Sequence, residues 1–142
     1  MKYKFGHWES DIELNSEESF GFIYRVINTT DGRQYIGKKQ YWFYKKSKKL
    51  KPSGWQTYTG SSKDLNSDIK KIGKDKFKFC IVAECVTRGW LSYLESNYLH
   101  KENALTEWIN DDTRLYYNKQ IGATRYVPKR VDNNTPVPRK KK

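Results

Sequence analysis

The amino-acid sequence predicts an α/β (α+β) domain in which a small, mostly antiparallel sheet of three strands is flanked by helices. Three observations support this class: two apolar segments enclose a turn early in the chain, one nearly all-apolar strand lies mid-chain, and two segments have helical periodicity. The 142 residues suffice for one domain with a modest core. We expect this domain at 20–122, after a mixed-charge arm at 1–19 and before a basic, flexible tail at 123–142.

The first two strands are expected to form an antiparallel hairpin. Residues 20–27, FGFIYRVI, are rich in β-branched and aromatic side chains, which favour a strand. The segment NTTDG is typical of a turn, and RQYIG at 33–37 is the returning strand. The hairpin places Tyr24 and Tyr35 on adjacent strands.

A lysine-rich segment follows at 38–51, with seven lysines and no acidic residue around four consecutive aromatic residues. We expect it to open a helix and to loosen at KPSG. Its positive charge suits contacts with a phosphate backbone, which give affinity and salt dependence without sequence readout. The lysines selected as DNA-binding are Lys38, Lys39, Lys46, Lys48 and Lys49.

The remaining elements follow in the order helix, strand, helix. Either Ser61 or Ser62 can cap a helix whose apolar residues Leu65, Ile69 and Ile72 share one face. Residues 77–86, FKFCIVAECV, predict a central strand that is covered on both sides. Residues 90–105 predict the second helix, and residues 115–122 a short terminal strand or loop.

The charge of the chain predicts a polyanionic partner. Lysine and arginine total 28 against 16 acidic residues, a formal net charge of +12, and nucleic acid is the commonest polyanion. No apolar run approaches the ~20 residues of a membrane-spanning helix, and no secretion signal is recognisable at the N-terminus. We therefore expect a cytoplasmic protein that is not secreted and does not contact a membrane.

The two cysteines, Cys80 and Cys85, are five positions apart in one predicted strand and should face opposite sides of the sheet. This spacing argues against a disulfide between them and for a reducing compartment. With only two histidines in the chain, there is no zinc-ligand spacing either.

Glu95 has an unusual position on the second predicted helix. A helical wheel places it inside the apolar stripe formed by Leu91, Leu94 and Tyr98. Burying a carboxylate costs several kcal/mol unless the charge is paired or bound to a cation. Glu95 is therefore either a residue at the edge of the stripe that meets a lysine or a ligand of a cation. Glu102 falls on the same side and competes for this interpretation.

Two triplets mark the hairpin. Phe22-Ile23-Tyr24 ends the apolar part of the first strand, and Tyr35-Ile36-Gly37 begins eleven positions after Tyr24. A glycine precedes the first triplet, at Gly21, instead of opening it.

Further landmarks follow in a fixed order: a serine-capped helix ending at Gly73, the strand FKFCIVAE, Glu95 three residues before Tyr98, and the pair Tyr117-Asn118. This succession resembles the GIY-YIG nuclease family over roughly residues 20–122, and most of all its phage-borne homing-type endonucleases.

The resemblance implies roles for individual residues. Glu95 matches the glutamate that ligates a single divalent metal ion, Mg²⁺ or Mn²⁺, which leaves Glu102 a surface or supporting role. Of Tyr24 and Tyr35, one acts as or assists the general base that activates water and the other orients the phosphate. Asn118 matches the asparagine that supports the site by hydrogen bonding.

The chain departs from the family where an arginine usually follows the second triplet. That position is Lys45, so Lys45, Lys46 or Lys39 must supply the charge, or activity is reduced. A family histidine is also missing, and Tyr58 is the candidate polar substitute.

The implied function is a metal-dependent DNA endonuclease acting on double-stranded DNA, in a bacterial host cell if the chain is phage-encoded. No separate DNA-binding domain is expected after residue 122, so specificity would come from this domain, a homo-oligomer or an accessory partner. One alternative is a non-catalytic DNA-binding regulator with the same fold. Another is a small RNA-binding protein with stacking aromatic residues.

Overall fold

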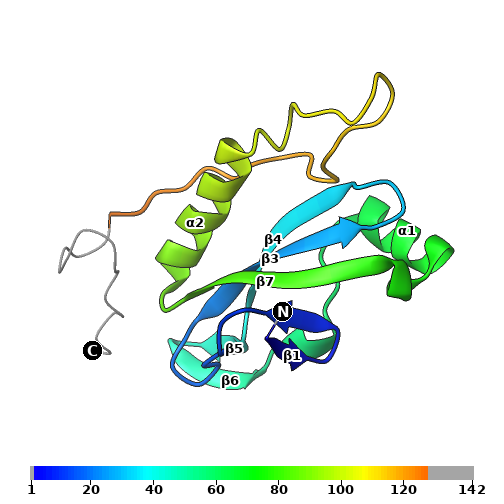
Figure 1. Cartoon of the computed structure of the whole chain (residues 1–142). Coiled ribbons are helices and arrows are strands. Elements are labelled where there is room, and N and C mark those ends of the chain that lie inside the picture. Colours follow the sequence, from blue (N-terminus) through cyan, green and yellow to red (C-terminus); the bar gives the residue numbers. More distant parts are fainter. Residues whose placement is uncertain (1, 128–142) are drawn as a thin grey trace.

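The computed structural model describes residues 2–127 and contains a five-stranded sheet of order β1-β2-β7-β3-β4 and a separate two-stranded ribbon, β5-β6 (Figure 1). Two α-helices and two short 3₁₀ helices, η1 (Trp55–Thr57) and η2 (Lys74–Lys76), complete the described fold. The elements are β1 (Tyr3–Phe5), β2 (Trp8–Ser10), β3 (Gly21–Asn28), β4 (Gln34–Gln40), β5 (Trp42–Lys45), β6 (Lys48–Pro52), α1 (Lys63–Ile72), β7 (Phe77–Cys85) and α2 (Arg88–Lys101). The predicted flexible tail falls largely on residues outside the described part of the chain.

The sheet has five strands, so the expected number of three was wrong, although the α+β class is confirmed. Strands β1 and β2 come from the segment expected to be an arm, and β2 pairs with β7 in parallel. Trp8 is fully buried and donates its Nε1–H to the carbonyl oxygen of Trp55 at 2.8 Å. These strands were missed because each has only three residues and lies among charged side chains, which hide the alternation.

The central hairpin has the expected antiparallel pairing. Tyr24 lies opposite Gly37 and Val26 lies opposite Tyr35, while Gly32 makes the turn with a φ of 87°. Strand β3 lies between β4 and β7, so β4 is an edge strand of the sheet. This edge position decides how the candidate site is reached.

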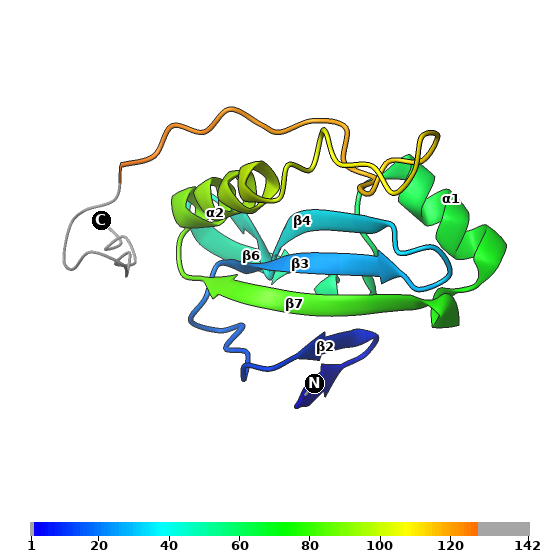
Figure 2. The same cartoon turned by 45° about the horizontal axis from the view of Figure 1, so that its top comes forward.

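The two helices pack on opposite faces of the sheet. Figure 2 shows them near opposite ends of the long strands. One core contains Tyr24 and Val26 with Leu65 of α1, and the other contains Ile23 and Ile36 of the hairpin with Leu91 and Leu99 of α2. Both cysteines are buried as free thiols in β7. The apolar middle of β7 is explained by this burial on two sides.

The lysine-rich segment is a β-ribbon, so the expected helix was wrong. Alternation of period two is visible in the burial of β5: Trp42 and Tyr44 are half-buried, whereas Phe43 and Lys45 are exposed. Lys46 and Ser47 form its two-residue turn with φ values of 50° and 66°. Two positive φ values are typical of a type I′ turn, whose twist matches that of the strands.

The helices begin and end at recognisable residues. Ser62 caps α1 by accepting a hydrogen bond from the Leu65 backbone N–H at 3.2 Å, and Gly73 ends it with a φ of 112°. Thr87 caps α2, which starts two residues before the predicted helix and ends four residues before its predicted end. Neither helix in residues 2–127 has the length and apolarity needed to cross a bilayer.

Candidate active site

Tyr24 and Tyr35 lie on the same face of the hairpin. Their ring centroids are 6.1 Å apart, and Tyr24 is only 1% exposed. A Cβ atom on Gly37 would lie 2.4 Å from the Tyr24 hydroxyl oxygen, and one on Gly60 would lie 3.3 Å from it. The glycine of the second triplet is therefore required because the phenol passes directly over the backbone of the neighbouring strand.

Further polar groups surround the two phenols. Tyr58 packs edge-on against Tyr24 with ring centroids 6.1 Å apart, and His7 Nε2 lies 2.8 Å from the Tyr58 carbonyl oxygen. The hydroxyls of Tyr35 and Ser61 are hydrogen-bonded at 3.1 Å. The adjacent serines thus have different tasks, because Ser62 caps α1 and Ser61 contacts a site tyrosine. The sequence showed two possible caps but did not indicate this division.

Glu95 approaches from α2, which packs on the opposite face of the sheet. It is half-buried, and burial raises the pKa of its carboxyl, while the Lys38 ammonium and backbone N–H lower it. Its charge in turn makes a smaller contribution to raising the pKa of both Tyr24 and Tyr35, after burial and the neighbouring tyrosines. Because β4 is an edge strand, side chains from both faces of the sheet can meet beside it.

The two phenols are neutral at neutral pH. Burial is the main cause that raises the pKa of Tyr24 well above its ordinary value, and it also raises the pKa of Tyr35. The hydrogen bond with Ser61 acts in the opposite direction on Tyr35. A neutral phenol can donate a hydrogen bond to a phosphate oxygen or pass a proton along a hydrogen bond.

Glu102, the other carboxylate of the apolar stripe, has a different environment. It forms an ion pair with Arg25 and accepts a hydrogen bond from the Tyr116 hydroxyl at 2.8 Å. The bond from Arg25 is the main cause that lowers the pKa of Glu102. Of the two candidates, Glu102 is therefore already neutralised by a guanidinium, whereas Glu95 is desolvated beside the phenols.

Lys39 contacts Tyr58, the tyrosine that packs on Tyr24. Its Nζ lies 4.2 Å from the centroid of the Tyr58 ring and 5.3 Å from that of Phe43. Burial lowers the pKa of the Lys39 ammonium. Strand alternation also places Lys39 on the same face as Tyr35 and Gly37.

The other candidate lysines lie elsewhere. Lys45 and Lys46 are exposed at the end of the ribbon, and within residues 2–127 neither has a hydrogen bond or ion pair to the site. Lys38 donates to Ser92 Oγ at 2.8 Å, next to Glu95 on the helix. Lys48 is exposed at the start of β6. Lys49 donates to the Glu17 carbonyl oxygen at 2.7 Å and so contacts the N-terminal segment.

The Asn118 side chain binds the backbone of Ile36, the middle residue of the second triplet, at the edge of β4. Its Oδ1 accepts from the Ile36 backbone N–H at 3.0 Å, and its Nδ2 donates to the Ile36 carbonyl oxygen at 2.8 Å. The side chain thus takes the place of a neighbouring strand at a buried position, 6% exposed. This contact holds Ile36, and with it Tyr35 and Gly37.

Replacing Asn118 by Ala is expected to lower the free energy of unfolding by about 2 kcal/mol, because both backbone groups of Ile36 lose their partner. Urea unfolding measures this change. The matched control is Asn110→Ala, which removes a side chain that binds only its own exposed turn. An equal loss in the two variants would contradict the role of Asn118.

The donors fit one metal ion held by few protein ligands. No group of three or more His, Cys, Asp or Glu side chains that could hold a metal occurs in the described residues. Mg²⁺ often keeps several waters and binds through one or two carboxylates together with substrate phosphates. A single half-buried carboxylate near neutral phenols suits that mode of binding.

Comparison with curated proteins and with solved structures gave no match. A family model described as "Putative endonuclease segE, GIY-YIG domain" matches residues 6–121. The matched span contains both triplets, Glu95 and Asn118. The chain belongs to the GIY-YIG family of nucleases, whose substrate is DNA.

Proposed function

We propose that this protein is a DNA endonuclease that hydrolyses phosphodiester bonds with one divalent metal ion held by Glu95. The observation that carries the proposal is the half-buried Glu95 carboxylate, whose charge acts on two neutral phenols at the edge strand β4. A surface that only binds DNA needs positive charge but gains nothing from a half-buried carboxylate. The arrangement therefore supports chemistry as well as binding.

The chain's own groups then divide the work of hydrolysis. Mg²⁺ or Mn²⁺ on Glu95 would polarise a phosphate oxygen. Tyr35 is the more accessible phenol, so it contacts the attacking water and can accept a proton from it while passing its own proton to Ser61 Oγ, whose hydroxyl proton is released to solvent because Ser61 is exposed. Tyr24, which is almost fully buried, orients the bound phosphate from the core side of the site.

Lys39 supplies the positive charge that the family usually takes from an arginine. Its Nζ lies over Tyr58 on the tyrosine face, whereas Lys45 is at the end of the ribbon. A fixed cation in a partly dehydrated site stabilises the charge that develops on the phosphate. A lysine gives this charge without the bidentate geometry of a guanidinium.

Lys39→Met is expected to lower kcat about 100-fold at saturating DNA, because a charge that stabilises the transition state is lost. Lys39→Arg should restore most of the rate. Lys45→Met should act mainly on KM, since Lys45 is remote from the tyrosines. Steady-state cleavage of a labelled duplex separates the two parameters, and a larger kcat loss for Lys45→Met would contradict the assignment.

The function itself is tested by nicking of supercoiled plasmid with Mg²⁺, with Mn²⁺ and with excess chelator. Nicking that needs the metal and is lost in Glu95→Gln supports the nuclease. Binding without cutting under any metal would favour a non-catalytic DNA-binding regulator. The lysine at the position of the family arginine is consistent with this alternative. Equal competition by RNA would point to an RNA-binding protein instead.

The biological setting is part of the same proposal. We place the enzyme among homing-type or phage nucleases that act on double-stranded DNA in the cytoplasm of a bacterial host. A homo-oligomer or an accessory DNA-binding partner would add to the specificity of the single domain. Cleavage measured against protein concentration distinguishes a monomer from an oligomer.

A further inference from the structure

We propose that the outer face of the β5–β6 ribbon is the surface by which this nuclease holds duplex DNA, with the ribbon lying in the major groove beside the cleaved bond. The outer face is defined by Phe43, Lys45, Lys48 and Lys51. This inference rests on the proposed function, since it names the element that presents DNA to the site.

The pairing of the ribbon separates its two faces. Directly opposed residues share a face, and the pairs are Lys45 with Lys48 and Phe43 with Lys51. The other face carries Trp42 and the pair of Tyr44 with Lys49. A bulge between Phe43 and Tyr44 puts an extra residue, Leu50, into β6.

The inner face is already occupied by the protein. The Tyr44 ring stacks on Phe20 with centroids 5.4 Å apart, and Trp42 donates its Nε1–H to the Ser16 carbonyl oxygen at 2.9 Å. Lys49 lies over the Trp42 ring at 4.8 Å and bonds to Glu17. These contacts fix the inner face of the ribbon on residues 16–20.

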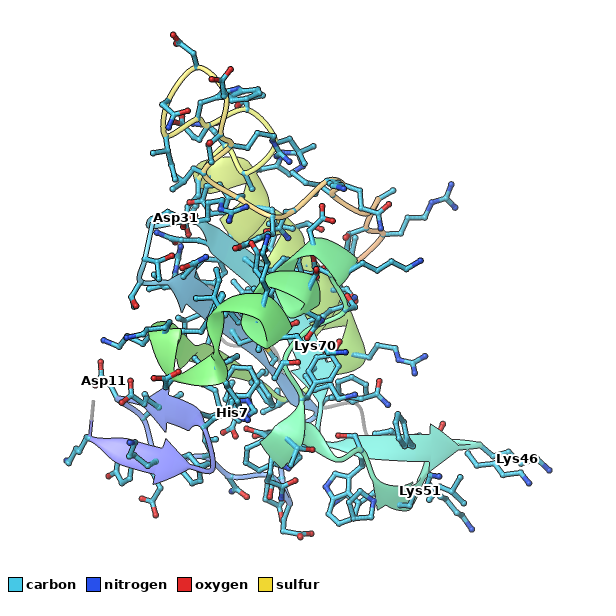
Figure 3. The ribbon with its side chains drawn as sticks, turned by 90° about the vertical axis from the view of Figure 1, so that its right-hand side faces the viewer. His7, Asp11, Asp31, Lys46, Lys51 and Lys70 are labelled. Carbon is cyan, nitrogen blue, oxygen red and sulfur yellow. The ribbon has the colours of Figure 1, made fainter. Side chains whose placement is uncertain are left out.

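The outer face is exposed, apolar in part and positively charged. Phe43 is 38% exposed, and Leu50 at the bulge is 60% exposed, so apolar contact surface lies among the lysines. Lys45 and Lys48 lie directly opposite each other, which destabilises the ribbon by charge repulsion. Figure 3 shows the ribbon projecting from the body, with Lys46 at its far end. A bound polyanion would remove the repulsion.

This face leads directly into the candidate active site. Lys51 Nζ lies 5.8 Å and Lys39 Nζ 5.3 Å from the centroid of the Phe43 ring. Lys39 also lies over Tyr58, which packs on Tyr24. Lys51 and Lys39 therefore form a row of positive charges from the ribbon to the tyrosines. This row matches the row of phosphates along one DNA strand.

The shape of the ribbon selects the major groove of DNA. That groove is about 12 Å wide and admits a two-stranded β-ribbon, whereas the minor groove is about 6 Å wide. The major groove of double-stranded RNA is too deep and narrow for side chains to read. Within the groove, lysines reach phosphates and base edges, and Phe43 is placed for apolar contact with thymine methyl groups.

The test measures binding of the full chain to a labelled duplex in excess chelator, so that no cleavage takes place. Lys45→Gln combined with Lys48→Gln is expected to lower affinity at least tenfold and to reduce the slope of log K against log salt by about 2. The matched control is Lys70→Gln combined with Lys71→Gln on α1, which removes the same charge from exposed positions away from the ribbon. Equal slopes in the two double variants would overturn the proposal.

Competition distinguishes the groove and the nucleic acid. Methyl green, a major-groove ligand, should displace the protein, and distamycin, a minor-groove ligand, should not. The opposite pattern, or equal binding of double-stranded RNA, would overturn the assignment. If the ribbon variant binds normally while the wild type nicks plasmid with Mg²⁺, only this inference fails. If the ribbon results hold and no metal supports nicking, only the proposed nuclease function fails.

Discussion

Glu95→Gln is expected to lower metal-dependent cleavage at least ~100-fold, the scale on which disturbed metal sites lose activity, while DNA binding in chelator is unchanged. The neutral amide keeps the size of the side chain but loses the charge that would hold the metal. Plasmid nicking and binding in chelator measure the two properties on the same preparation. Cleavage retained by the variant would show that the nuclease site lies elsewhere.

The same variant should not be less stable at neutral pH. Burial raises the pKa of Glu95, so the folded state binds its proton more tightly than the unfolded state. The stability linked to this group is complete below the ordinary pKa of a glutamate and is lost as pH rises through the raised value. Gln removes that loss, so urea unfolding at neutral pH should show equal or higher stability.

Cleavage by the wild type has the opposite pH dependence, because the metal requires the ionised carboxylate. The rate should rise as pH rises through the raised pKa of Glu95. Glu102→Gln serves as the comparison, since Glu102 is bound to Arg25. Loss of that contact should lower the free energy of unfolding by about 1 kcal/mol and leave the rate per folded molecule near that of the wild type.

Gly37→Ala is expected to lower the free energy of unfolding by about 3 kcal/mol and to abolish cleavage. The new methyl group would lie 2.4 Å from the Tyr24 hydroxyl oxygen and 2.5 Å from the carbon that bears it. Tyr24 is 1% exposed, so its ring has no free space to enter and the phenol must leave its position.

Gly122→Ala is the matched control for this change. A Cβ on Gly122 would meet no atom within 4 Å, so unfolding and cleavage should stay near the wild type. Gly37→Ala tests the close approach of the two strands independently of any metal. A stable and active Gly37→Ala protein would show that Tyr24 does not occupy the observed position.

Elements with strong local signals could be predicted from the sequence. The hairpin followed from segments rich in β-branched and aromatic residues on either side of a turn, and α1 followed from its cap and the spacing of Leu65, Ile69 and Ile72. The apolar stripe around Glu95 indicated a carboxylate turned toward the protein. These features depend on residues close together in the chain, where periodicity is informative.

Features that depend on tertiary contacts could not be predicted. Strand β2 is held by parallel pairing with β7, about seventy residues later, and its three residues carry no clear pattern. The ribbon was taken for a helix because its aromatic residues and its lysines occur in runs. They do not alternate along the chain as polar and apolar residues of a half-buried strand usually do. The position of Lys39 over Tyr58 depends on a loop that meets β4 only in the folded chain.

The bond between Asn118 and Ile36 also bears on the solubility of the protein. An edge strand with free N–H and C=O groups is a template on which strands of other molecules can assemble. Asn118 occupies both groups of Ile36, and Gln34 is paired with the backbone of Leu115 and Tyr117. A chain shortened before residue 115 would therefore expose this edge and should form intermolecular aggregates on storage, even though all strands of its sheet are present.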